Sequence, residues 1–545
     1  MKFDVRVPLI ATAALLAVFI FAAAEDKTTP DNPVHLQQGW SADTADRWHF
    51  VSQGTAIFPY EWFLALEQPG QPPGQTALIS ARENLQRLGF LTEPASATNN
   101  PDGLPVGLYR TPVDFSDGKH ACWKGNWLGL GCAGCHTGQV NYRGQQIRIE
   151  GGPSHIDIGG LTDQLTKALA NLGDPGDPQA AARFLARVKL PQPDVSAGLR
   201  CFQRLPSISA DPQNPDTIAG AGRLDAHGAG LNQILAGPMG EPRNFAPLTA
   251  PVRYPALWDT PRFNWVLYNG SIRQPLTRNL IEALGVQAPM KHDSTMLGLN
   301  VTHAVQMDNL VWGQRTLMDL RSPRWPDAIL GVPDLKMAAL GASVYAKACA
   351  NCHEPAPAAA PPGACDEIQI PLVDLNQIGT DPAQATTFAN RRITLSKIGG
   401  PDDIANFDAA RIVTGNVAEQ WIAKSRDNAA AAAAINCGRQ NEYRGVLQYR
   451  ARPLNGIWAM APYLHNGSVP SLHDLLLPPE QRPKTFYVGN WEFDPAKVGY
   501  AMATQTPGAS LFDTTVRGNS NAGHTYGTDL TEDDRKALIE YLKTL

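Results

Sequence analysis

One five-residue pattern, Cys-x-x-Cys-His, occurs twice in this chain of 545 residues. The first copy is Cys132-Ala-Gly-Cys135-His136 and the second is Cys349-Ala-Asn-Cys352-His353. In this pattern the two thiols add to the vinyl groups of haem, and the adjacent histidine lies under the iron as its proximal ligand. A redox dithiol would need a βαβ context, and a zinc site would need a further Cys/His pair nearby. The sequence has neither, so it predicts two covalently attached c-type haems.

The N-terminus has the pattern of an export signal. Lys2 and Arg6 precede an apolar run, residues 7–24, which ends in three alanines before a polar boundary. A basic start, an apolar stretch and small residues are typical of a secretory signal peptide. The run is also about long enough to span a bilayer, so an uncleaved anchor is the alternative. Both alternatives place the rest of the chain outside the cytoplasm, as a periplasmic or secreted protein.

Length and composition limit the architecture. A chain this long is expected to form two or three domains, and 48 glycines with 45 prolines indicate long loops. We expect a mainly α-helical fold with two cytochrome c-like haem domains and a few short strands, the domains covering residues 25–332 and 333–545. The formal net charge of -5 gives no basic surface for nucleic acid.

Two helices are expected to support the second attachment site. Residues 340–349 are predicted to form a helix that runs into Cys349. Near the C-terminus, Thr531 and Asp534 form a capping box, and Leu538 and Leu542 share one helix face. We expect the terminal helix to pack on the helix that leads into the haem site.

Four cysteines lie outside the two pentapeptides. In an oxidising compartment they are candidates for disulfide bonds. Cys365 and Cys437 bracket the middle of the second haem region and are the first pair expected, whereas Cys122 and Cys201 are either partners or free thiols.

The second axial position decides what each iron can do. A second strong ligand suits an iron to electron transfer, and an open position lets O2 or peroxide bind. His524, in the Gly/Asn-rich loop 518–524, is one candidate ligand for the second haem. Its competitors are His465, His473, Met460 and Met502. Spacing alone does not choose among them.

Residues 454–472, Leu-Asn-Gly-Ile-Trp-Ala-Met-Ala-Pro-Tyr-Leu-His-Asn-Gly-Ser-Val-Pro-Ser-Leu, resemble the C-terminal signature of the bacterial dihaem cytochrome c peroxidase and MauG superfamily. Together with Phe493-Asp494-Pro495 and the loop 518–524, they resemble the branch that contains rubber oxygenase and the dihaem fatty-acid dioxygenases. The resemblance covers most of the chain from about residue 45. It implies that His353 and His524 are the two axial ligands of the second haem.

The same resemblance implies a five-coordinate first haem, held by His136, that binds O2. Its distal wall is implied to come from residues 263–282. Tyr268, before Asn269-Gly270, is the closest match to the aromatic residue between the two haems, and Trp265 is the alternative electron bridge. Both aromatic residues also suit a plain core. The superfamily places a calcium ion between the haems, near Arg452 and Pro453.

Peroxidase members of the superfamily carry a distal glutamate and glutamine, and the acid moves a proton between the peroxide oxygens. Glu282 and Gln274 are the candidates here, but they lie closer to Asn269-Gly270 than the peroxidase pattern expects. Oxygenase members have an apolar distal pocket instead. The residues that fit such a lining are Leu276, Leu280, Ala283 and Leu284.

Three functions follow from these patterns. The favoured one is an enzyme whose first haem activates O2 against an apolar unsaturated substrate, a polyisoprenoid or a fatty acid, while the second haem relays electrons. The alternative is a peroxidase that reduces H2O2 with electrons from a donor cytochrome or cupredoxin. The third is an electron carrier in which both irons are fully ligated.

Overall fold

The computed structural model describes residues 33–71, 76–116, 118–204, 215–293, 300–353 and 365–545. These residues belong to one unit by their contacts, so the proposed boundary at residue 333 stays a prediction. Helix outweighs strand, 39% against 15%, while the assignment to two cytochrome c-like domains also stays a prediction. The apolar run 7–24 lies outside the described residues. Within them, no helix combines the length and the apolar composition needed to cross a membrane.

Two small sheets carry the first pentapeptide. One has the order β2-β4-β3 and the other β1-β6-β5. Their strands are β1 (Val34–His35), β2 (Phe58–Pro59), β3 (Leu108–Val113), β4 (Gly125–Leu130), β5 (Thr137–Tyr142) and β6 (Gln145–Glu150). The chain leaves the first sheet at the end of β4, turns through α4 (Cys132–Cys135) and enters the second sheet at β5. The attachment turn is therefore held between two sheets.

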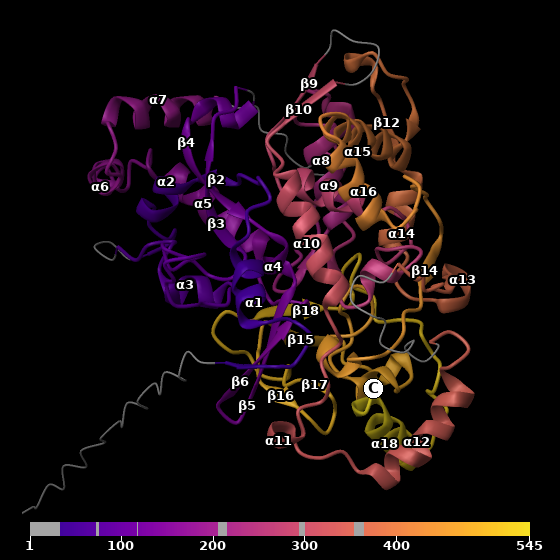
Figure 1. Cartoon of the computed structure of the whole chain (residues 1–545). Helices are drawn as coiled ribbons and strands as arrows, with labels where there is room; N and C mark the ends of the chain where they lie inside the picture. The colour runs from indigo at the N-terminus through magenta and orange to yellow at the C-terminus, as the bar shows by residue number, and fades with distance from the viewer. Residues whose placement is uncertain (1–32, 72–75, 117, 205–214, 294–299, 354–364) are drawn as a thin grey trace, which may run out of the picture. The chain divides into compact units, whose positions relative to one another are not determined.

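Helices cover these sheets in the N-terminal part of the chain (Figure 1). They are α1 (Ala42–Phe50), α2 (Tyr60–Ala65), α3 (Arg82–Arg87), α5 (Ile158–Asn171), α6 (Ala180–Arg187) and α7 (Gln192–Gln203). Their core is rich in aromatic side chains, with Trp62 and Trp127 fully buried. A disulfide between Cys122 and Cys201 joins α7 to the 3-10 turn Gly118–Cys122, which confirms the partner alternative for these two cysteines.

A second group of helices packs around a separate apolar core. Its members are α8 (Ala226–Leu235), α9 (Pro275–Gly285), α10 (Met307–Asp319), α14 (Ala383–Asn390), α15 (Asn406–Ala423) and α16 (Arg426–Asn436). Helices far apart in the sequence, such as α9 and α15, lie side by side here (Figure 1). The hairpin β9 (Met290–Asp293) and β10 (Asn300–His303) contacts α15. The predicted disulfide between Cys365 and Cys437, just after α16, is confirmed.

Two crossing helices carry the second pentapeptide, as predicted. Helix α12 (Leu335–Ala348) runs into Cys349, and α18 (Glu532–Lys543) packs on it. The crossing is so close that a β-carbon on Gly341 would lie 2.0 Å from the carbonyl oxygen of Ala537. The Thr531 hydroxyl accepts a hydrogen bond from the Asp534 backbone N–H at 3.1 Å, which confirms the predicted helix cap.

Short elements complete the chain. They are β7 (Arg223–Leu224), β8 (Val252–Arg253), α11 (Asp327–Leu330), β11 (Leu372–Asp374), α13 (Leu375–Ile378), β12 (Arg392–Ile393), β13 (Ile404–Ala405), β14 (Gln448–Arg450), α17 (Leu472–Leu475), β15 (Thr485–Val488), β16 (Phe493–Asp494), β17 (Gly499–Tyr500) and β18 (Ser510–Asp513).

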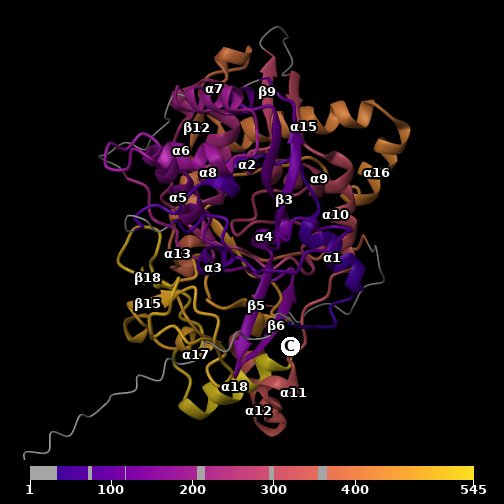
Figure 2. The same ribbon diagram turned by 90° about the vertical axis from the view of Figure 1, so that its left-hand side faces the viewer.

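The regions of the two pentapeptides are packed against each other. The hairpin β5–β6 lies beside the C-terminal segments in both views (Figure 1, Figure 2). Asn141 donates its backbone N–H to the Trp491 carbonyl oxygen at 2.7 Å, and Tyr500 donates its hydroxyl to the Gln139 carbonyl oxygen at 3.0 Å. One apolar cluster contains Ala133 from α4 together with residues of α12 and α18. The two attachment sites therefore share a core.

Candidate haem-binding sites

The first pentapeptide forms a one-turn helix followed by its histidine. Gly107, at a φ of +87°, lets the backbone approach this turn, since a β-carbon there would lie 2.1 Å from the Cα of Gly134. The Nδ1 atom of His136 lies 2.8 Å from the carbonyl oxygen of Pro255. A carbonyl oxygen can only accept, so Nδ1 carries the proton and Nε2 keeps its lone pair for a metal. Burial lowers the pKa of His136 to about 4, which keeps the ring neutral.

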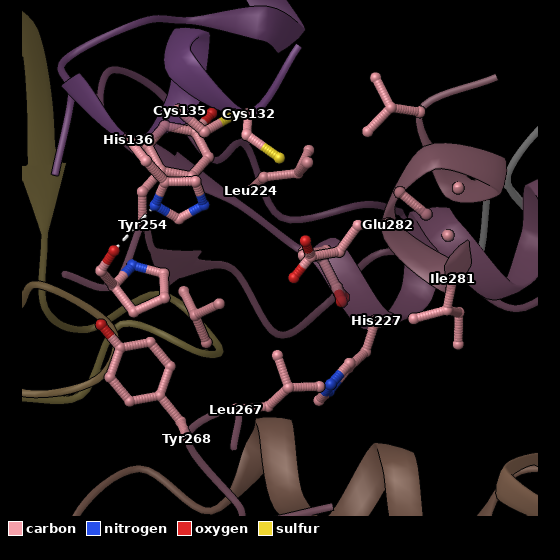
Figure 3. A pocket seen from close by; sticks show the side chains of 18 of the residues that line it. Cys132, Cys135, His136, Leu224, His227, Tyr254, Leu267, Tyr268, Ile281 and Glu282 are labelled. Atoms are coloured by element: carbon pink, nitrogen blue, oxygen red, sulfur yellow. Dashed lines mark hydrogen bonds between the residues drawn. The ribbon is translucent and has the colours of Figure 1, made fainter. Parts of the chain in front are cut away.

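A large cavity opens beside this turn (Figure 3). Its empty volume is about 1280 Å³, solvent at the mouth included. Apolar side chains form most of the wall, among them Leu224, Leu231, Leu267, Ile272, Ile281 and Phe388. Cys132, Cys135 and His136 lie together at one side (Figure 3). The cavity therefore has the attachment chemistry that a covalent haem needs.

Two acidic residues of the described chain, Asp225 and Glu282, line the cavity, and Glu282 is the one predicted as a candidate from the sequence. It lies on α9 and points its carboxyl into the cavity, toward the side of Cys132 and His136 (Figure 3). Burial raises its pKa, while the Arg278 guanidinium opposes the rise. Arg278 itself donates to the side-chain oxygens of Asn279 and Gln314. Glu282 is thus a carboxyl that holds its proton to higher pH than an exposed one.

His227 lines the same cavity, and sequence reasoning missed it. Its ring centre lies 4.4 Å from that of Phe388, and its Nδ1 lies 2.7 Å from the amide nitrogen of Gln384. Burial lowers its pKa to about 4, so the ring is neutral. His227 and Gln384 are 157 residues apart, and no sequence pattern connects them.

Tyr268 lines the cavity, and its hydroxyl is buried without a hydrogen-bond partner among the described residues. Its position between two haems stays a prediction. Three arginines lie near it: Arg253 and Arg452, which are buried, and Arg450, which is half-buried. Burial lowers the pKa of Arg450 to about 9 and that of Arg452 to about 10. Within the described part of the chain none of the three forms an ion pair, and each has a buried nitrogen without a partner.

Buried cations without anions are costly. Haem brings two propionate carboxylates, which are suitable partners for these guanidinium groups. These three arginines form no ion pair with a carboxylate among the described residues. This is a second observation, independent of the cysteines, that fits a haem.

The other predicted distal residues lie elsewhere. The ring of Trp265 is covered by the Arg444 guanidinium at 3.5 Å, and the side-chain amide of Gln274 donates to the Arg439 carbonyl oxygen at 3.1 Å. Neither is among the described residues that line the cavity.

The predicted apolar lining from α9 is wrong. Leu276, Leu280, Ala283 and Leu284 are fully buried in the helical core. The residues of α9 that face the cavity are instead Ile281, Glu282 and Gly285. Helix α9 is apolar on more than one side, so its periodicity could not show which side meets the cavity.

The second pentapeptide repeats the proximal arrangement of the first. The Nδ1 atom of His353 lies 2.8 Å from the carbonyl oxygen of Arg452, so Nε2 is again left for a metal. The ring of His524 lies opposite, with its centre 6.3 Å from that of His353. A metal–nitrogen bond is about 2 Å long and an imidazole centre lies about 1 Å behind its nitrogen, so two histidines on one iron have ring centres about 6 Å apart. This pair has the spacing of a bis-histidine site.

A network of hydrogen bonds holds His524 in place. The buried Arg482 guanidinium donates to the carbonyl oxygens of Asn521, Gly523 and His524 at 2.6, 2.8 and 3.0 Å. Gly523 has a φ of +71°, and a β-carbon there would lie 2.2 Å from the carbonyl carbon of Gly379. Burial lowers the pKa of His524 to about 4, so the ring is neutral and able to bind a metal.

The competing ligands have other partners. The His465 ring stacks on Tyr449 at 4.1 Å, and His473 lies 3.5 Å from the Asp474 carboxylate. Met460 and Met502 belong to the apolar core shared by the two sites. Among these candidates, only His524 has a ring that lies beside the His353 ring in the described part of the chain.

Comparison with known proteins adds a family to this geometry. The family model described as "RoxA-like, cytochrome c-like" matches residues 448–487, the segment that contains Arg452. "Uncharacterized protein y4iJ" of Sinorhizobium fredii (strain NBRC 101917 / NGR234) is 35% identical over 98% of this chain and 97% of its own length. This chain belongs to the y4iJ family. A second protein of that organism, "Uncharacterized protein y4iM", is 26% identical over 53% of this chain and 63% of its own length.

The RoxA-like match makes this member of the y4iJ family a cytochrome c-like protein, for which haem c is the implied cofactor. Calcium stays a prediction. The carbonyl oxygen of Arg452, near which the ion was expected, accepts from His353. In the described part of the chain, no group of three His, Cys, Asp or Glu side chains is arranged to hold a metal.

Proposed function

We propose that this member of the y4iJ family is an exported dihaem c-type oxidoreductase that uses O2 to oxidise an apolar unsaturated substrate, such as a polyisoprenoid or a fatty acid. The reaction takes place in the cavity beside Cys132, Cys135 and His136. The observation that carries the proposal is the composition of the cavity wall, which is apolar apart from a few polar groups and is next to a haem attachment turn. The RoxA-like match supports the same branch of the superfamily.

When bound, the haem would supply an iron able to activate O2. The balance is simple: one carbon–carbon double bond and one O2 are consumed, and each carbon gains one oxygen as a carbonyl. No external electron or proton is needed. The apolar wall, including Leu267, Ile272 and Ile281, binds the hydrocarbon chain and excludes water. His136, fixed by the Pro255 carbonyl, holds the proximal side.

The second site has a different part in this proposal. His353 and His524, whose ring centres are 6.3 Å apart, would both hold the second haem, which would suit this site to electron transfer rather than to binding of O2. A donor cytochrome or cupredoxin would deliver electrons here.

Peroxide reduction is the second candidate, because Glu282 is a buried carboxyl with a raised pKa on the cavity wall. H2O2 takes up two electrons and two protons and gives two waters, and an acid in this position moves a proton between the peroxide oxygens. The position of Gln274 counts against this candidate, because its side chain bonds to Arg439 and does not line the cavity.

The decisive experiment compares the two reactions in the purified holoprotein. We expect O2 uptake with oleate or polyisoprene and carbonyl products in equal number to the oxygen atoms consumed. We also expect Ile281→Trp, which fills the cavity, to abolish this reaction, while Leu64→Trp, at a 41% exposed position on α2, leaves it unchanged. Rapid peroxide turnover with a reduced cytochrome, without O2 uptake, would favour the second candidate.

A further inference from the structure

The two proximal histidines are connected through backbone carbonyls. His136 donates from Nδ1 to the carbonyl oxygen of Pro255, and His353 donates from Nδ1 to that of Arg452, both at 2.8 Å. In each case the acceptor is a backbone group, so its position depends on how firmly its own segment is held. The acceptor segments, residues 255–258 and 450–453, come from different parts of the chain.

The Arg452 side chain joins these two segments. Its Nη1 donates to the carbonyl oxygen of Ala256 at 3.0 Å, and its Nη2 donates to that of Trp258 at 3.1 Å. Ala256 directly follows Pro255, the residue that holds His136. One residue therefore holds His353 with its backbone carbonyl and, with its guanidinium, the peptide next to the acceptor of His136.

The connection is buried and rigid. Trp258 is fully buried and donates its indole N–H to the Asn455 carbonyl oxygen at 3.0 Å, which ties the two segments a second time. Arg452 is 8% exposed. The planar guanidinium reaches two carbonyls at once, which a lysine ammonium on a flexible stem does not reproduce.

We propose that Arg452 is a positioning residue for both haems, fixing the proximal histidine of each iron at the same time. A hydrogen bond from Nδ1–H to a carbonyl makes the imidazole a better electron donor to the iron and favours the oxidised state. If the guanidinium fork is lost, the acceptor of His136 loosens and the carbonyl of Arg452 shifts. The reduction potentials of both haems then rise together. The inference rests on the proposed pair of haems, but not on the substrate.

The test is Arg452→Lys, with Arg391→Lys as its matched control. Arg391 is also buried, and its guanidinium also donates to a backbone carbonyl, that of Asn244. It does not line the cavity, and none of its side-chain hydrogen bonds in the described structure reaches residues 255–258. The measurements are haem content by mass spectrometry, the potential of each haem by spectroelectrochemistry, and the EPR spectrum of the oxidised protein.

We expect Arg452→Lys to raise both potentials and to shift the EPR signals of both haems, and Arg391→Lys to leave them near the wild-type values. A change confined to the second haem would overturn the proposal, as would equal changes in both variants. If Arg452→Lys does not take up haem, Arg452→Gln and Arg391→Gln are compared by the same criterion. A wild-type protein without two haems would instead refute the proposed function.

Discussion

The same pentapeptide is built into two different supports in this molecule. The first copy lies between strands β4 and β5, and the second lies at the end of helix α12. Both supports nevertheless place the Nδ1 atom of the histidine 2.8 Å from a backbone carbonyl. The local motif and one acceptor are therefore enough to define a proximal ligand, whether the chain arrives as strand or as helix.

The two sites differ on the side opposite the proximal histidine. The first faces an apolar cavity that contains Glu282, whose pKa is raised by burial, whereas the second faces the His524 ring, with ring centres 6.3 Å apart. These distal groups come from segments far along the chain, not from the motif. An open and a closed iron can thus arise from identical attachment sequences, and the predictions below probe that contrast.

The largest effect is expected when either attachment site is removed. Cys132→Ser with Cys135→Ser removes the first haem, and Cys349→Ser with Cys352→Ser removes the second, because each thioether pair anchors one porphyrin. Mass spectrometry of exported protein should show one haem fewer in each double variant. Only the first pair abolishes O2 binding. Two haems retained in either variant would contradict the assignment.

The second-largest effect is expected when the site of His353 and His524 loses one of its two histidines. His524→Ala removes the ligand opposite His353, so the number of irons that bind carbon monoxide in the reduced protein should rise from one to two per chain. His473→Ala serves as the control, because His473 lies against Asp474. The measurement is an optical titration with carbon monoxide, and a single binding iron in His524→Ala would show that another group is the ligand.

The sequence predicted one helix cap, which depends on a local pattern, together with one helix crossing and one disulfide between segments far apart in the chain. The cap at Thr531, the crossing of α12 and α18 and the pairing of Cys365 with Cys437 are confirmed. Capping and helix amphipathicity act over a few residues, so they can be read directly from the sequence.

The distal side of the first site could not be predicted in the same way. His227 reaches the cavity only because α8 packs beside α14, and its partner Gln384 is distant in sequence. Arg452 gives no local signal for its contacts with Ala256 and Trp258. Such contacts depend on tertiary packing, which one sequence does not encode as a pattern.

A smaller effect is expected from Glu282→Gln, which keeps the shape of the side chain and removes its acidity. If the cavity is an oxygenase site, the rate of O2 uptake should change by less than about tenfold, because the reaction needs no acid. Steady-state O2 uptake measures this, and Glu532→Gln on the exposed start of α18 is the control.

The pH profile sharpens the test of Glu282. Because burial raises its pKa, the carboxyl stays protonated to higher pH, and a reaction that uses this proton slows as the pH rises through that raised pKa. If the protein is an oxygenase, its rate should not fall in this way as the pH rises, and Glu282→Gln should leave the pH profile unchanged. A loss of roughly 10²–10⁴-fold in peroxide turnover would support the second candidate function.

The smallest effect concerns the helical support of the second site, which the first site lacks. Gly341→Ala gains up to about 1 kcal/mol in helix propensity, but its β-carbon would lie 2.0 Å from the Ala537 carbonyl oxygen. Overpacking of this kind costs about 1–3 kcal/mol, and the obstacle is backbone that cannot rotate away, so the net change should be destabilising. The thermal unfolding midpoint, followed by haem absorbance, should fall.

Ser343, also on α12, is exposed and serves as the control position. The free energy of unfolding of Ser343→Ala should stay within about 0.5 kcal/mol of the wild-type value. Because α12 and α18 support Cys349 and not Cys132, the Gly341→Ala variant should lose the bis-histidine spectrum at a lower temperature than it loses carbon monoxide binding at the first haem. Simultaneous loss of both signals would mean that the core shared by the two sites, rather than the helix crossing, determines the stability of each.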